Sequence, residues 1–247
     1  MKKLLGLFLC LGLVGCATLP VPQQKSEKYT ANFSYSPVAQ GVSSRNEVTF
    51  AVANAVYKQS PGEVFWFASS QFVNFSPAVR QDLSKIIIAK GFGVRGPYES
   101  YDLIPFQDKK AIDLLLVPAF ELSVVLKEQK EQLENYWGWQ SPTIQTGIAD
   151  VSGQLNIELR DIATRELIWT KTIPIDQFEF SYIVSIPWGR PYVPGKLYNY
   201  DSVLDGMAKG MGQKYPEIMA KVYNLIDVEE MGILKKQAQE LKSKKGY

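Results

Sequence analysis

The stretch that decides the fold is Val151-Ser152-Gly153-Gln154-Leu155-Asn156-Ile157-Glu158-Leu159-Arg160, in which apolar and polar residues alternate. Alternation with a period of two is typical of a strand that has one buried and one exposed face. A turn is expected at residues 161–165, and the residues after it alternate again, with apolar side chains at Leu167, Trp169, Ile173 and Ile175. The two runs predict an antiparallel β-hairpin.

A helix is predicted upstream, from Ser76 to Gly91. Ser76 can cap it and Pro77 suits its first position, while one face is apolar, with Val79, Leu83, Ile86 and Ile87. Strands are expected at Val48 to Val56, where a helical start is the alternative, and at Asp113 to Leu126. The intervening residues 98–108 are predicted to form a loop. An aromatic cluster before the helix is expected to be core rather than a ligand site: Phe65, Trp66, Phe67, Phe72 and Phe75.

The last part of the chain has helical periodicity. Residues 201–226 predict a long helix that Pro216 kinks or divides. Three glycines weaken this helix, and their expected reason is close approach to another element rather than phosphate binding: Gly206, Gly210 and Gly212. Asp227 and Glu230 predict a capping box for a final helix, whose apolar positions are Met231, Leu234, Ala238 and Leu241.

This order of elements predicts an α+β fold. The expected architecture is a mainly antiparallel sheet with helices on one face, followed by C-terminal helices. One domain spanning residues 33–247 is sufficient, because no second set of elements or internal repeat is found.

The N-terminus predicts a lipoprotein signal peptide over residues 1–15. Lys2 and Lys3 precede a short apolar run that ends in Leu13-Val14-Gly15-Cys16, and this run is shorter than the roughly 20 residues that span a bilayer. Cys16 is therefore the expected lipid attachment site and the first residue of the mature chain. The alternative is an ordinary secretory signal that ends near Ala17. Residues 16–32, which are polar and contain prolines, predict a flexible tether.

Composition narrows the chemistry. Histidine is absent from all 247 residues, which removes the commonest general base and zinc ligand and argues against an enzyme. No metal or other cofactor is expected. The only cysteine besides Cys16 is Cys10, inside the signal peptide, so the mature chain has no internal disulfide. A net charge of +2 and the absence of a recognition motif argue against nucleic acid as a partner.

Two segments are candidate ligand sites because aromatic side chains can stack on sugar faces while charged groups bind hydroxyls or a carboxylate. The first segment, residues 127–142, supplies Lys127, Lys130, Tyr136, Trp137 and Trp139. The second, residues 182–200, supplies Trp188, Arg190 and Tyr192. The alternatives are a hairpin tip packed on its own sheet for the first segment and a rigid connection that covers the core for the second.

Several segments resemble the neuraminyllactose-binding haemagglutinin lipoproteins. They are the lipid-modification motif at Cys16, Asn32-Phe33-Ser34-Tyr35-Ser36-Pro37, the capped helix that leads into Gly91-Phe92-Gly93-Val94, and the ending Lys236-Gln237-Ala238-Gln239-Glu240-Leu241-Lys242-Ser243-Lys244. The resemblance implies a surface or flagellar-sheath protein of the kind proposed as sialic-acid adhesins. The family's basic motif, Lys-Arg-Thr-Ile-Gln-Lys, is replaced here by Lys127-Glu128-Gln129-Lys130-Glu131-Gln132. The resemblance therefore does not extend to sialic-acid specificity.

The function expected from the sequence is that of a non-enzymatic, acylated outer-membrane lipoprotein with an adhesin-like role on the surface or flagellar sheath. Its expected partners are the membrane, through the N-terminal lipid, and a glycan or envelope protein. The alternative is a periplasmic accessory or assembly lipoprotein of an envelope machine, in which the 151–175 hairpin docks a partner. A hydrolase that uses the carboxylates of Glu121 and Glu128 is a more remote alternative.

Overall fold

The computed structural model describes residues 29–38, 47–58, 66–136, 139–186, 197 and 200–245, and for residues 132–136 and 139–143 it describes the backbone only. Within these residues, one sheet contains β1 (Thr49–Val52), β2 (Val56–Lys58), β3 (Gly93–Arg95), β4 (Leu114–Tyr136), β5 (Trp139–Asp161) and β6 (Leu167–Ile186). The helices are α1 (Phe75–Ala89), α2 (Phe106–Ala111), α3 (Asp201–Leu225) and α4 (Val228–Lys245). Short 3-10 turns are η1 (Trp66–Ala68), η2 (Ser70–Phe72) and η3 (Tyr101–Leu103).

The sheet is mainly antiparallel, as predicted, but it has a parallel part. Its strand order is β3-β1-β4-β5-β6, with β2 paired to β4. β4, β5 and β6 form long antiparallel ladders, whereas β1 runs parallel to both β3 and β4. The predicted α+β class with C-terminal helices is confirmed. The parallel part could not be read from the sequence, because a short apolar run does not show the direction of its neighbours.

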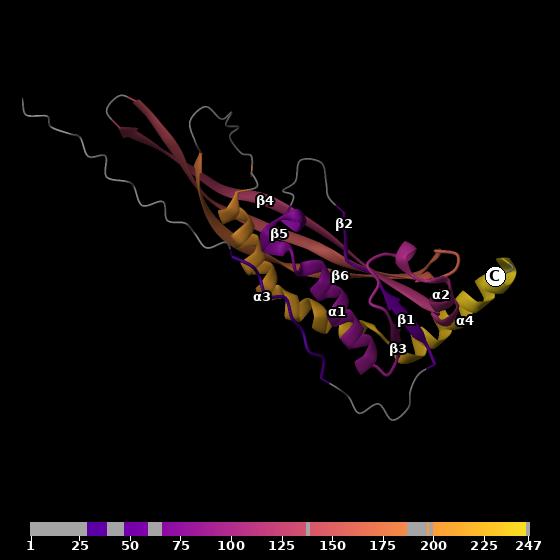
Figure 1. The fold of residues 1–247 in the computed structure, drawn as a ribbon. Coiled ribbons are helices and arrows are strands. Elements are labelled where there is room, and N and C mark those ends of the chain that lie inside the picture. Colours follow the sequence, from indigo (N-terminus) through magenta and orange to yellow (C-terminus); the bar gives the residue numbers. More distant parts are fainter. Residues whose placement is uncertain are drawn as a thin grey trace, which may run out of the picture.

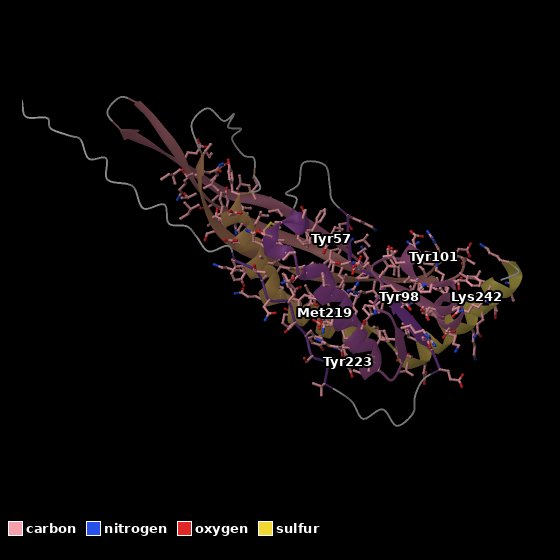
Figure 2. The ribbon with its side chains drawn as sticks, in the orientation of Figure 1. Tyr57, Tyr98, Tyr101, Met219, Tyr223 and Lys242 are labelled. Carbon is pink, nitrogen blue, oxygen red and sulfur yellow. The ribbon has the colours of Figure 1, made fainter. Side chains whose placement is uncertain are left out.

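The main core lies between one face of the sheet and helices α1, α3 and α4 (Figure 1). Figure 2 labels two α3 residues of this core, Met219 and Tyr223. Alternation places Leu155 and its odd-numbered neighbours in this core, as the pattern predicts. A second, smaller cluster lies on the opposite face near α2 and contains Ala51, Ile104, Ile112, Leu115 and Ile162. The long helices thus cover one face of the sheet, as predicted, and residues 96–113 cover part of the other face.

Helix α1 ends as predicted but does not begin as predicted. Ser76 does not cap it, because the helix begins at Phe75 and the Ser76 Oγ accepts a hydrogen bond from the Ala55 N–H at 3.0 Å. Gly91 ends the helix as predicted, with φ at 87°, and the Phe92 N–H donates to the Ile87 carbonyl at 3.1 Å. This bond satisfies a carbonyl of the last turn.

The predicted loop at 98–108 is wrong in part, since it contains η3 and the start of α2. The strand predicted to end at Leu126 continues to Tyr136, and its partner β5 begins already at Trp139. Charged residues are depleted in strands on average, which hid this extension. They are tolerated at a solvated strand edge, where they also discourage pairing with other chains.

Helix α3 is continuous, so Pro216 does not divide it. The expected close approach is confirmed at two glycines. A Cβ at Gly206 would lie 2.4 Å from Phe180 Cδ2, and a Cβ at Gly210 would lie 2.3 Å from Phe178 Cδ2. Gly212 differs, because a Cβ there would meet only Ala31 Cβ, at 3.9 Å. The two phenylalanines belong to β6, so the glycines let α3 rest on the sheet.

The start of α4 uses half of the predicted capping box. The Glu230 N–H donates to Asp227 Oδ1 at 2.9 Å. The Glu230 carboxylate does not return to Asp227, because its Oε1 accepts a hydrogen bond from Trp169 Nε1 at 2.7 Å. Helix α4 is thereby joined to β6.

The segment after the predicted tether is packed between α1 and α3. Ala31 and Phe33 are buried, so the packed part of the chain starts within the residues predicted as tether. The buried Asp82 carboxylate accepts hydrogen bonds from the Tyr35 N–H at 2.7 Å and the Tyr215 hydroxyl at 3.0 Å. Lys85 pairs with its other oxygen at 2.7 Å. The described members of the aromatic cluster join this core, since Trp66, Phe72 and Phe75 are buried and Phe67 is partly buried and packed against it.

Candidate functional site

Both candidate segments run towards the same end of the sheet, which we call the hairpin end. There β4 and β5 pair as far as Tyr136 and Trp139, and β6 ends at Ile186, paired with Thr143. Helix α3 returns to the same place, because the Ser202 Oγ donates to the Ile183 carbonyl at 2.6 Å. Thr143 and Trp139 are about 13 Å apart along β5 at the usual rise per strand residue. The hairpin end lies at the opposite end of the molecule from the C-terminus of α4 (Figure 1).

Most of the predicted ligand-binding side chains fall outside the described structure. Tyr136 and Trp139 are described by their backbone only, as paired strand residues rather than loop residues. Five other predicted residues lie outside the described residues: Cys16, Trp137, Trp188, Arg190 and Tyr192. Their roles stay predictions. The register of β5 with β6 brings the two segments to the same end, and this register could not be predicted from local patterns.

Lys127 is described in full, and its charge is paired within the sheet. It lies at an irregularity of β4, where the register with β5 shifts between Leu126 and Glu128. Its Nζ forms an ion pair with Glu179 of β6, beside Asp150 of β5. The hydrogen bond to Glu179, and then the charges of Asp150 and Glu179, raise the pKa of Lys127. The two side chains are about half exposed, at 48% and 51%, so this is a surface ion pair that holds Lys127 only weakly.

Lys130 is exposed further along the same strand. Glu128 and Glu131 are close to it in the sequence and are also exposed. Like charges repel an approaching carboxylate, so this part of β4 is not a basic surface.

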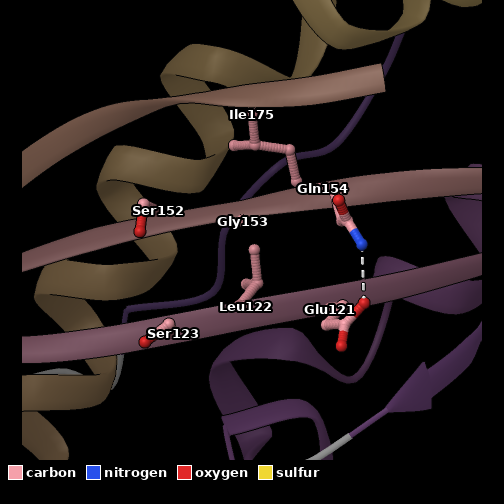
Figure 3. A pocket seen from close by; sticks show the side chains of 7 residues that line it. All are labelled: Glu121, Leu122, Ser123, Ser152, Gly153, Gln154 and Ile175. Atoms are coloured by element: carbon pink, nitrogen blue, oxygen red, sulfur yellow. Dashed lines mark hydrogen bonds between the residues drawn. The ribbon is translucent and has the colours of Figure 1, made fainter. Parts of the chain in front are cut away.

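A hollow of about 410 Å³ lies on the sheet between β4, β5 and β6 (Figure 3). Its lining is Glu121, Leu122, Ser123, Ser152, Gly153, Gln154 and Ile175. Gln154 Nε2 donates to Glu121 Oε2 at 2.8 Å, which Figure 3 shows across the two strands. Gly153 is required here, because a Cβ would lie 2.2 Å from the Glu121 carbonyl oxygen. The hollow thus forms where β5 lacks a side chain.

The carboxylate pair considered for hydrolysis is not formed. Glu121 and Glu128 are seven residues apart on one strand, which separates them by roughly 23 Å. Paired carboxylates of glycosidases lie about 5 to 9.5 Å apart. Among the described residues there is also no group of three or more His, Cys, Asp or Glu residues that could hold a metal ion. Nor is any helix in the described part of the chain long and apolar enough to cross a membrane.

No family model and no curated protein matches the chain. Among solved structures, it is similar to a neuraminyllactose-binding hemagglutinin homolog from Helicobacter pylori. The TM-score is 0.57 at 16% identity, over 85% of this chain and 99% of that chain. More remote are a protein from Xanthomonas campestris, with a TM-score of 0.31 at 13% identity over 86% of this chain and 98% of that chain, and a lipoprotein from Neisseria meningitidis, with a TM-score of 0.24 at 10% identity over 69% and 99%. The similarity to the hemagglutinin homolog shows that the two chains share a fold, whereas the comparisons with family models and curated proteins detect no relationship.

Proposed function

We propose that the protein is an acylated lipoprotein of the bacterial outer membrane that binds a partner at the cell surface or flagellar sheath and catalyses no reaction. The observation that carries the proposal is the fold shared with the hemagglutinin homolog over 85% of this chain. The lipid-modification motif at Cys16 independently supports the acylated part of this proposal, because it is a feature of sequence rather than fold.

The hairpin end is the proposed binding surface. Both aromatic candidate segments reach it, at the strand ends marked by Trp139 and Ile186. Glu128, Glu131 and Glu179 surround Lys127 and Lys130 with an excess of negative charge, so recognition of a sialate by charge is disfavoured. We propose stacking of sugar or protein groups on the aromatic side chains, chiefly Trp137 and Trp139.

Protease treatment of intact cells tests the location. A surface protein is degraded, and the same protein in cells with a permeabilised outer membrane shows that the protease is competent. Protection in intact cells together with cleavage after permeabilisation would contradict the surface role. That outcome would favour the accessory function in the periplasm.

Titration with sialyllactose and with neutral lactose tests the binding mode. Each stacked ring contributes on the order of 1 kcal/mol beyond its buried area, so the Trp137→Ala, Trp139→Ala double variant should lose roughly 30-fold in affinity. The Lys127→Ala, Lys130→Ala variant should bind within about twofold of the wild type, and it serves as the matched control. A strong preference for sialyllactose that the lysine changes abolish would refute stacking and support recognition by charge.

A further inference from the structure

A second pocket lies far from the hairpin end, at the carboxyl ends of β1 and β3. These two strands are parallel neighbours. After β1 the chain enters β2, which pairs with β4, and after β3 it runs through η3 to α2, beside the smaller cluster. Ligands of open α/β sheets bind in a crevice outside the carboxyl ends of the parallel strands.

The crevice contains a pocket of about 310 Å³. Its lining includes residues 53–56, which follow β1, and residues 99–101, which follow β3. Arg160 and Arg165, near the turn between β5 and β6, also line it. Its volume is at the lower end of the range for small-molecule sites. Figure 2 shows Tyr98 and Tyr101 on this part of the molecule, away from the hairpin end.

Arg160 is held in place and retains donors. Its Nε and Nη2 donate to Glu158 Oε2 at 3.2 and 2.7 Å, and its Nη1 donates to the Arg165 carbonyl at 3.3 Å. Each terminal nitrogen of a guanidinium has two hydrogens, so Nη1 and Nη2 each keep one N–H for a ligand. Such a pair of donors suits the two oxygens of a carboxylate.

Arg165 is held in a conformation that a non-glycine residue rarely adopts. Its φ is 63°, and its N–H donates to the Asp161 carbonyl at 3.0 Å. Asp161 Oδ1 fixes the same turn by accepting from the N–H groups of Ala163 at 3.0 Å and Thr164 at 2.7 Å. The turn places the Arg165 guanidinium 3.8 Å above the Tyr101 ring. Strained residues of this kind cluster at functional sites.

The remaining lining defines the rest of the ligand. The floor is apolar, with Ala53, Leu115 and Val117, and the lining carries one carboxylate, Glu99, against the two arginines. Asn54 Oδ1 is buried and has no hydrogen-bond partner among the described residues, so it can accept a bond from a ligand donor. The Tyr101 ring is already in contact with Arg165 and with Lys109 Nζ at 4.0 Å, which leaves it unsuited to stacking on a sugar.

From these features we infer that the pocket binds a small organic carboxylate with an apolar body and a hydroxyl or amide donor. The carboxylate would bind the guanidinium groups of Arg160 and Arg165. The hydroxyl or amide donor would bind Asn54, and the apolar body would pack on the floor. The ion pair of Arg165 with Asp102 does not block the site, because both side chains are largely exposed, at 55% and 76%, and exposed pairs contribute little. This site is independent of the binding surface proposed at the hairpin end.

Equilibrium dialysis of the full-length mature protein in detergent tests the inference, with radiolabelled para-hydroxybenzoate as the probe and empty micelles as the blank. Saturable binding is expected below about 10 mM, since so small a ligand cannot bind tightly. The neutral analogue para-hydroxybenzamide should compete at least about tenfold more weakly. Equal competition by the amide, or no saturable binding, would overturn the proposal.

Arg165→Gly separates binding from folding. Glycine accepts a positive φ without strain, so the variant should melt at the wild-type temperature or above it while binding the probe at least about tenfold more weakly. Lys221→Gln is the matched control, because it removes an equal charge on α3 outside the pocket and should leave the affinity unchanged. Unchanged binding by Arg165→Gly, or an equal loss in Lys221→Gln, would refute the assigned site.

Discussion

Replacing Gly206 by alanine should destabilise the protein, although alanine is the better helix former. The added Cβ would lie 2.4 Å from Phe180 Cδ2, 2.9 Å from its Cγ and 3.1 Å from its Cβ. Because the contact includes the base of the side chain, rotation of the ring alone does not relieve it. Phe180 is buried against the sheet, so either α3 or β6 must move.

The expected magnitude follows from two opposing effects. Overpacking of a well-packed core costs about 1–3 kcal/mol, and this contact warrants the upper end of that range. Alanine recovers about 1 kcal/mol of helix propensity relative to glycine. The net loss for Gly206→Ala is therefore about 2 kcal/mol in the free energy of unfolding, which corresponds to a melting temperature lower by roughly 4–8 °C for a protein of this size.

Two other glycines provide matched controls in helices. A Cβ at Gly212 would meet only Ala31 Cβ at 3.9 Å, and a Cβ at Gly232 would meet nothing within 4 Å. Alanine at either position should raise the free energy of unfolding by about 0.5–1 kcal/mol. Urea unfolding of the purified mature variants, followed by circular dichroism, measures all three. If Gly206→Ala were as stable as Gly212→Ala, the close approach of α3 to β6 would be wrong.

Three further predictions concern other parts of the chain. Cys16→Ser should abolish incorporation of labelled palmitate, because only the thiol forms the thioether to diacylglycerol; continued labelling would refute the lipoprotein assignment. A chelator should leave the melting temperature of the purified chain unchanged, since the sequence offers no histidine, and a large decrease would reveal a structural metal. Burial, and then the nearby negative charge of Asp82, raise the pKa of Tyr215 above its usual 10.0. The folded chain therefore keeps this proton where the unfolded chain releases it, so stability is retained below pH 10 and falls above it, by up to about 1.4 kcal/mol per pH unit. Tyr215→Phe should show a shallower alkaline decline in urea unfolding, and an unchanged slope would contradict this reasoning.

The predicted site was only partly accessible to sequence reasoning. Lys127 was identified as a candidate from its neighbours in the sequence, but its actual partner, Glu179, is 52 residues away. Nothing local indicates that pairing, because it depends on the registers of two successive ladders. The pocket beside Arg165 gave no sequence signal at all, since its lining comes from several separate segments of the chain.

What the sequence determined by itself is local. Period-two alternation specified β5 and the buried face of the hairpin, and Gly91 specified the end of α1, because each depends on residues within a few positions. Only the tertiary structure decided the parallel placement of β1 between β3 and β4, the length of the β4–β5 extension, and the contact of Gly206 with Phe180. These features arise from the pairing of residues far apart in the chain. Their energies come from burial and backbone hydrogen bonds that no local pattern encodes.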